Sequence, residues 1–359
     1  MSSNFANRYV SITPEHTTST GVRSYGTASA GASAKQFGEV DDESISPSFD
    51  LMTRGDMSRY GAAKSLNGKE YSEGGLNLVI QADDFCGMVL YGLYGDNTAN
   101  PPASAGYSYA ANVHTWTEVK DMILPSFTLE IGREDKEHTY TGMCLSRLSV
   151  SGSVGEYATM SVDYNGKAES AVSSLNASPT FAGATLEGLH FAEGTVTFSS
   201  DNATAVASSN IKSMSIEWNT NLNTDDACSI GNRTYVRQPE MQMREITGSV
   251  EFSRPSIGTA LGGANQDPQY ELITATGGEE YDGTAAGAPA IKLQFNQGSA
   301  VGLTVELFKV RWEAPSMNVS GRDSSTMSLN FVALVDDNGQ MSRVTFKTGN
   351  TSDGRYSGL

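Results

Sequence analysis

The chain has 359 residues, a formal net charge of −17 and 18% charged residues. This length can form two domains of ordinary size, each with its own core. The acidic balance disfavours non-specific binding to nucleic acid and adhesion to membranes through a basic patch, and no apolar run approaches the roughly 20 residues needed to cross a bilayer.

The two ends of the chain lack the pattern of packed elements. Residues 1–36 are rich in Ser, Thr, Ala and Gly and predict an extended N-terminal arm rather than a packed domain. This stretch has no basic segment followed by an apolar run, so we expect no secretory leader. Residues 348–359 are rich in Gly, Ser and Asp and predict a mobile tail.

The first predicted strand covers residues 45–51, where Phe49 and Leu51 form the apolar face of a period-2 pattern. A polar stretch of more than 20 residues follows, and then a second strand over residues 76–80. Connections of this length between strands are typically disordered or used for contact with a partner.

The same order of elements returns in the second half of the chain. Ile216 and Trp218 mark a strand, a polar stretch follows it, and residues 246–252 form the next strand. A short helix is predicted after each pair of strands, over residues 83–93 and 268–274.

Two strands of matched pattern come next, over residues 127–131 and 291–295. Each alternates apolar and polar residues, as in an antiparallel sheet covered on one side. The polar positions of these two strands are Thr128, Glu130, Lys292 and Gln294.

One stretch of sequence occurs twice. Residues 150–164 contain VSG and, further on, TMSVDY, and residues 319–331 contain VSG and TMSLNF. Asn-Gly pairs at 165–166 and 338–339 predict turns just past these strands. A copy this close indicates that one structural unit is present twice. The apolar positions of both strands are predicted core residues: Met160, Val162, Tyr164, Met327, Leu329 and Phe331.

The predicted fold is mainly β, with two tandem, similar domains of β-sandwich or barrel-like form. Each domain would contain a short helix and a long inter-strand loop. We place the domains at residues 37–166 and 189–347. Residues 167–188 are poor in large apolar residues and predict a linker.

No constellation of residues points to catalysis. The four histidines lack metal-ligand spacing, and Walker A, GxSxG and HExxH motifs are absent from the sequence. Cys86, Cys144 and Cys228 form no CxxC motif, so we expect buried or free thiols in a reducing compartment. We therefore expect no catalytic residue, no metal and no cofactor.

The two long polar stretches combine charge with Tyr and Arg, a composition typical of contact surfaces. A flexible exposed loop is the alternative interpretation. The candidate contact residues are Arg54, Asp56, Arg59, Tyr60 and Lys64 in the first stretch and Asp225, Asp226, Arg233, Tyr235 and Arg237 in the second.

The order of these parts resembles the tail tube (major tail) proteins of long-tailed bacteriophages, in the variety with two tube domains per subunit. In both halves a strand and a long polar loop precede LNLVI or ITGSVEF and a short helix, FCGMVLYGLYG or YELIT. FTLEIG or IKLQF then leads into the VSG and TMS strands. The resemblance covers about residues 37–347, and the opening RYVSITPEHTTSTG also resembles the start of such proteins.

The resemblance implies a structural virion protein, assembled in the host cytoplasm, whose stacked rings form the tail tube and conduct DNA. Two-domain members form trimeric rings with pseudo-sixfold symmetry, and a tape measure protein and a tail terminator are the implied partners. The long loops would reach the adjacent ring, and an acidic lumen would pass DNA without binding it. We expect Thr128, Glu130, Lys292 and Gln294 to face that lumen.

Two other classes of function remain open at this point. A carbohydrate- or receptor-binding β-sandwich module of the tail would need an aromatic platform or a Ca²⁺ site, and Trp116, Trp218 and Trp312 are its available tryptophans. A glycosidase would need a pair of carboxylates across a cleft, and no such pair stands out.

Overall fold

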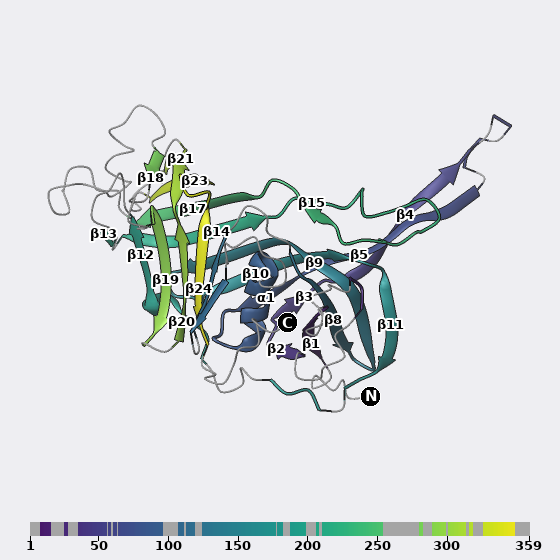
Figure 1. The fold of residues 1–359 in the computed structure, drawn as a ribbon, viewed down its shortest axis with the longest axis horizontal. Helices are drawn as coiled ribbons and strands as arrows, with labels where there is room; N and C mark the ends of the chain where they lie inside the picture. The colour runs from purple at the N-terminus through teal and green to yellow at the C-terminus, as the bar shows by residue number, and fades with distance from the viewer. Residues whose placement is uncertain are drawn as a thin grey trace.

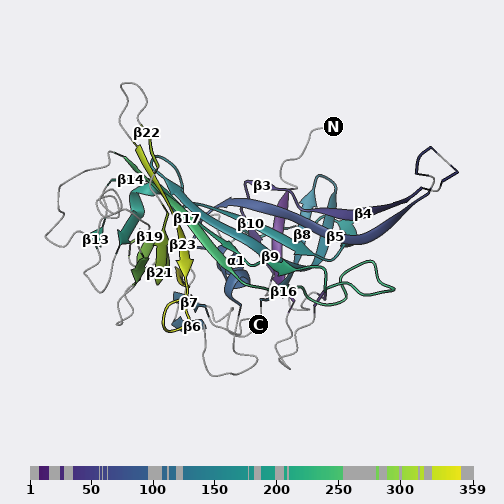
Figure 2. The same ribbon diagram turned by 90° about the horizontal axis from the view of Figure 1, so that it is seen from above.

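A computed structural model gives the fold and describes residues 8–15, 25–27, 35–55, 57–58, 60–62, 64–95, 107–110, 113–118, 124–176, 178–181, 187–198, 206–207, 210–253, 280–282, 289–298, 301–313, 316–318 and 326–348. Over these residues the protein is mainly β with one α-helix, which confirms the predicted mainly β class. A long hairpin extends away from the body in two perpendicular views (Figures 1 and 2).

The elements fall into two groups along the chain. The first group contains β1 (Tyr9–Pro14), β2 (Gln36–Gly38), β3 (Asp42–Glu43), β4 (Ser46–Arg54), β5 (Lys64–Val79), α1 (Asp84–Tyr94), β6 (Tyr107–Ala110), β7 (Val113–Thr117), β8 (Ser126–Arg133), β9 (Lys136–Ser153), β10 (Thr159–Gly166) and β11 (Glu169–Ser174). The second group contains the 3₁₀ helix η4 (Phe191–Glu193), β12 (Gly194–Phe198), β13 (Val206–Ala207), β14 (Ile211–Asn219), β15 (Leu222–Asn223), β16 (Glu240–Met241), β17 (Glu245–Ser253), β18 (Glu280–Asp282), β19 (Ile291–Gln297), β20 (Val301–Leu307), β21 (Lys309–Trp312), β22 (Ser316–Asn318), β23 (Thr326–Leu334) and β24 (Ser342–Lys347).

Strands of the two groups pair in the same order. In the first group β5 pairs with β10 and β10 with β9, while β8 pairs with β9 and β1, and β1 with β2. In the second group β17 pairs with β23, and β23 with β21 and β22. In the same way β19 pairs with β20 and β12, and β12 with β13. β11 and β24 close the two series by pairing with β9 and β20.

The two groups are joined by two strand pairings. β9 pairs with β14, so that Val150 lies opposite Ile216 in one continuous sheet. β7, from the first group, pairs with β24 of the second and places His114 opposite Phe346. Each group therefore contributes strands to a sheet of the other.

The helix α1 forms where the sequence predicts one. The Asp83 carboxylate caps it by accepting from the Cys86 N–H at 2.8 Å. Gly95, with φ of 70°, ends it, as a left-handed residue commonly does. The whole helix is buried against the sheets. The predicted counterpart at residues 268–274 lies outside the described residues.

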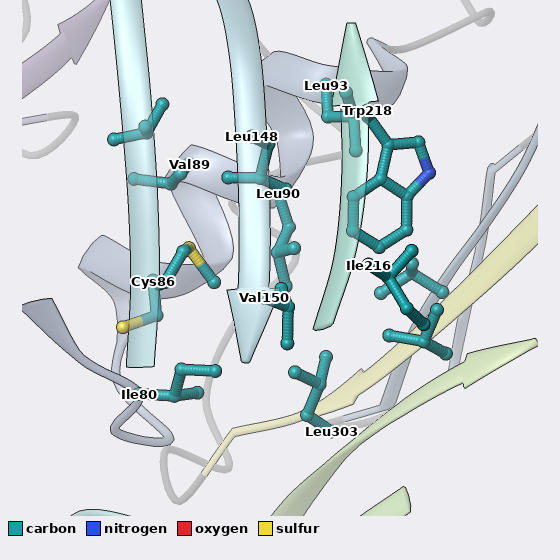
Figure 3. Packing of buried hydrophobic residues seen from close by; sticks show 14 of the residues in the cluster. Ile80, Cys86, Val89, Leu90, Leu93, Leu148, Val150, Ile216, Trp218 and Leu303 are labelled. Atoms are coloured by element: carbon teal, nitrogen blue, oxygen red, sulfur yellow. The ribbon is translucent and has the colours of Figure 1, made fainter. Parts of the chain in front are cut away.

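The core lies between the large sheet, α1 and the seven-stranded sheet. Leu148 and Val150 of β9 lie beside Ile216 and Trp218 of β14, with Leu90 of α1 close by (Figure 3). All six predicted core residues of the repeated strands are buried, which confirms that prediction. The three cysteines are free, and Cys86 and Cys144 are buried, also as expected.

Two segments predicted to lie outside the domains form strands. Within the predicted arm, β1 lies between β2 and β8 and is buried along its length, with Val10 and Ile12 in the hydrophobic core. Within the predicted linker, β11 pairs with β9. Composition missed both, since the ladder pairs backbone N–H and C=O groups whatever the side chains are.

Three local predictions are also wrong. Asn165-Gly166 makes no turn, because β10 continues through it between β5 and β9; the turn at Asn338-Gly339 does form. Phe49 and Leu51 are 55% and 62% exposed, and the buried residue of this segment is Ile45. The first polar stretch is largely strand, because β4 and β5 pair from Ser46 to Arg54.

Candidate assembly surfaces

The β4–β5 hairpin carries a concentration of exposed apolar side chains. Scattered exposed apolar residues are normal, but a concentration on one projecting element marks an interaction site. Among the described elements, none covers either face of the hairpin beyond its base (Figures 1 and 2). Its exposed large apolar residues are Phe49, Leu51, Met52, Met57, Tyr60 and Leu66.

The predicted contact residues of the first stretch lie around the tip of this hairpin. Arg54 and Lys64 are opposite each other in the last pair of the ladder, and both are exposed. Tyr60 is fully exposed between them. Asp56 and Arg59 lie outside the described residues. The structure thus places an aromatic ring and two cations together at the tip.

The second polar stretch, residues 220–244, packs on the first group of strands instead. The Tyr235 ring stacks on Tyr71 of β5 with centroids 6.4 Å apart, and its hydroxyl donates to Asn165 Oδ1 at 2.9 Å. Burial raises the pKa of Tyr235. Because its ring is 2% exposed, Tyr235 belongs to the subunit's own packing, and its prediction as a contact for a neighbouring subunit is wrong.

The charged residues of this stretch also meet their own chain while staying exposed. Asp225 pairs with Lys69 at 3.4 Å. Arg233 pairs with Glu70 at 3.7 Å, and its carbonyl accepts from the Glu70 N–H. Arg237 Nε donates to the Asp226 carbonyl at 2.7 Å. These contacts fix the stretch along β5.

Arg244 anchors the end of the stretch and was not singled out from the sequence. Its side chain is 3% exposed and forms an ion pair with Glu118 at 3.0 Å. It also donates to the Leu93 carbonyl at 2.5 Å, at the C-terminal end of α1, where a cation is favoured by the helix dipole. The guanidinium lies over the Tyr94 ring. Nothing in the local sequence distinguishes this Arg from its exposed neighbours.

The residues predicted to line a lumen differ in their surroundings. Thr128 is 1% exposed and donates to Glu15 Oε1 at 2.8 Å, because β1 pairs with β8 and brings Glu15 beside it, so its prediction is wrong. Glu130 is half-buried and forms an ion pair with Lys35. On β19, Lys292 pairs with Glu306 at 3.8 Å and Gln294 is half-buried.

A larger polar face lies on the large sheet, on the side away from α1. It alternates with the buried residues of β9, β10, β14, β17 and β23. Hydroxyls pair across it: Ser151 with Thr159 at 2.8 Å and Ser215 with Ser249 at 2.9 Å. Arg147, on the same face, is held by Glu217 at 2.5 Å. The face therefore presents hydroxyls and carboxylates with a neutralised guanidinium.

A cleft of about 760 Å³ opens beside β1, β3 and the end of β8. Its rim carries exposed carboxylates of Asp41 and Asp42. Arg133 donates to both carboxylate oxygens of Glu43 at 2.8 Å and to the Ile45 carbonyl. Bidentate pairs of this kind fix geometry, so the rim is rigid.

Other site types find little support in the described residues. No group of three or more His, Cys, Asp or Glu side chains is placed there to hold a metal ion. Trp116, Trp218 and Trp312 are buried, so they form no exposed aromatic platform. No helix in the described part of the chain is long and apolar enough to cross a membrane.

Edge strands, a projecting apolar hairpin and a polar sheet face define a β-sheet structural protein built to associate with other subunits. The sequence model of the phage tail tube protein family matches residues 6–333, and the chain belongs to that family. It is a structural protein of the virion tail that assembles into a tube. No curated protein sequence matches the chain.

Proposed function

We propose that three subunits form a closed ring with pseudo-sixfold symmetry, that rings stack into the tail tube, and that DNA passes through the lumen. Each chain supplies two neighbouring sixths, built from residues 8–174 and 190–347. These units extend the sequence-based domains to include β1 and β11. The role is structural rather than catalytic.

The junction between the two groups of strands carries this proposal. Inside one chain, β9 and β14 are the strands at which the two units meet in the large sheet, and they pair with each other. The corresponding outer strands of the chain, β3 and β4 at one end and β22 at the other, each pair on one side among the described residues. Edges of this kind recruit a further strand, and repeating the internal junction between subunits closes a ring.

The β4–β5 hairpin serves contacts between rings. It extends beyond the sheets and exposes apolar side chains with a cationic tip at Arg54 and Lys64. Asp56, Arg59 and Tyr60 belong to the same tip by sequence. The exposed Asp225, Asp226, Arg233 and Arg237, alongside β5, extend this contact region.

The polar face of the large sheet lines the lumen. Its hydroxyls and carboxylates offer DNA no cluster of cations, so the polymer slides without being held. Glu130, Lys292 and Gln294 lie on β8 and β19, which do not carry this polar face, and we assign them to contacts outside the lumen. A tape measure protein inside the tube and a tail terminator at its end remain the partners that the family implies.

Electron microscopy of purified protein tests the proposal. Negative-stain images are expected to show rings or tubes, and native mass spectrometry of rings is expected to give three subunits. Monomers that persist at all concentrations and enter no tails in an infected host would contradict it.

A further inference from the structure

The second unit contains a cleft that the first unit already fills. Gly152, at the end of β9, lies so close to Phe295 of β19 that a Cβ atom there would be 2.6 Å from its ring. The Val154 N–H donates to the Lys212 carbonyl at 2.9 Å, and the Phe191 N–H donates to the Glu156 carbonyl at 3.1 Å. The β9–β10 turn is thus seated between the starts of β14 and β12 and the end of β19.

The elements around that seat have counterparts around the open cleft. β1 pairs with β8 so that Val10 faces Ile131, and β12 pairs with β19 so that Val196 faces Leu293. Arg8, Tyr9 and Val10, the end of β8 and residues 41–43 line the open cleft. The same three elements therefore surround an occupied site in one unit and an open site in the other.

The register of the large sheet makes this correspondence residue-specific. Leu76 and Val250 are equivalent, because each lies opposite the repeated TMS strand, at Val162 and Leu329. Residues paired with them on the next strand are then equivalent as well.

Those next residues are Glu43, opposite Leu76, and Met214, opposite Val250. Ser44 therefore corresponds to Ser215. The strands on the opposite side of the TMS strands correspond in the same way. Asn318 of β22 pairs with Thr326 of β23, and Ser151 of β9 pairs with Thr159 of β10, so Asn318 corresponds to Ser151.

We propose that the strand edge beside the open cleft receives β22 of a second copy of this chain. β22 of that copy then pairs with residues 44–46 in the register that β9 adopts with β14. This inference rests on the proposed ring. Since Ser151 lies opposite Ser215 inside the chain, Asn318 of one subunit lies opposite Ser44 of the next.

The edge beside the cleft suits an incoming strand because the rim is already fixed. Arg133 ties Glu43 and Ile45 to β8 without a partner, so little ordering is required when the strand binds. The outer edge of β3 is exposed, and β3 pairs with β5 on its inner side. An exposed edge next to a preformed cleft is a template for strand addition.

Disulfide trapping in assembled protein tests the register. In a Cys228→Ser background, Ser44→Cys combined with Asn318→Cys is expected to give covalent trimers under mild oxidation, since residues directly opposite in a ladder lie within disulfide range. A mixture of the two single variants is expected to stop at covalent dimers. Ser44→Cys with Thr326→Cys places the second thiol one strand further away, and cross-linking should be lost.

An internal control shows that the chemistry works in folded protein. Ser151→Cys with Ser215→Cys is expected to close a disulfide within one chain, with or without assembly. If rings form but the Ser44–Asn318 pair stays reduced while this control oxidises, the proposed cleft contact is wrong and the ring stands. If the control oxidises and no rings or covalent oligomers form, both the contact and the proposed ring are wrong.

Discussion

The two long connections of this protein occupy the same place in their units and have opposite surroundings. The β4–β5 hairpin projects with its apolar side chains exposed. Residues 220–244, between β14 and β17, fold back on β5, with Tyr235 buried and Arg244 paired to Glu118. One connection has its partner inside the chain, and we propose that the other meets a neighbouring subunit.

This difference shows how a repeated unit becomes a subunit of an assembly. The first unit receives the second unit's connection along β5, and the second receives strand β7 from the first. Contacts between the two groups are thus made inside the chain, and in the proposed ring the equivalent surfaces at its two ends meet neighbouring subunits. Four predictions test this comparison.

The largest expected effect is at the anchor of residues 220–244. Arg244→Ala leaves Glu118 buried without its cation, and we expect a loss of about 3–5 kcal/mol in the free energy of unfolding, measured with urea. Arg233→Ala is the matched control, because its ion pair with Glu70 is exposed and worth under about 1 kcal/mol. Equal losses in both variants would show that burial does not anchor this connection.

Acid is expected to weaken the pairing of β7 with β24. Burial lowers the pKa of His114 to about 4, below its ordinary value near 6.5. As pH falls from 6.5 to 4, the unfolded chain binds a proton that the folded chain excludes, so stability falls, by about 3 kcal/mol in total.

The variant His114→Gln is expected to lose this pH dependence. Asp83 acts in the opposite direction, because burial raises its pKa to about 6 and the folded chain takes up that proton first. Comparing wild type with His114→Gln at each pH removes the contribution of Asp83. Parallel curves between pH 7 and 4 would contradict the assignment.

A smaller effect is expected at the hydroxyl of Tyr235. Tyr235→Phe removes the hydrogen bond to Asn165 and keeps the ring stacked on Tyr71, so unfolding should become easier by about 1 kcal/mol. Tyr157→Phe is the control, since Tyr157 is exposed, and its unfolding free energy should not change. A larger loss in the control would argue against the packing of residues 220–244 on β5.

The smallest effect on stability is expected in the hairpin. Leu51→Ser with Met52→Ser should change the free energy of unfolding by less than about 0.5 kcal/mol, because both side chains are exposed. The same change should shorten tubes seen by electron microscopy. Val335→Ser, at an exposed site outside the hairpin, should leave tubes unchanged. If the hairpin variant formed full-length tubes, the proposal that the hairpin makes contacts between rings would be wrong.

Much of the fold was predictable because the signal is local. Asp83 caps a helix, and the TMS strands alternate apolar and polar residues with period 2, so α1 and the core faces of β10 and β23 were predicted. Composition failed at β1 and β11, where Ser and Thr sit in strands, and at Phe49, where an alternating pattern has no core behind it.

The site was predicted less well, because it depends on distant contacts. The sequence marked Arg54, Tyr60 and Lys64, which lie together at the hairpin tip. The sequence grouped Tyr235 with the exposed residues of its stretch, and it gave no sign of the buried Arg244. Tyr235 is buried because it packs on Tyr71, and Arg244 because it pairs with Glu118, and both partners lie far away in the chain.

The sequence by itself determined the repeated VSG and TMS motifs, the β class, the helix α1 and the resemblance to tail tube proteins. These follow from periodicity, capping and repeated motifs, which act over a few residues or compare one stretch with another. Only the tertiary structure decided which strands the two units share, which long connection is covered and where the open cleft lies. Pairings such as Val150 with Ile216 and His114 with Phe346 join residues dozens to hundreds of positions apart, and their register is set by packing of the whole core.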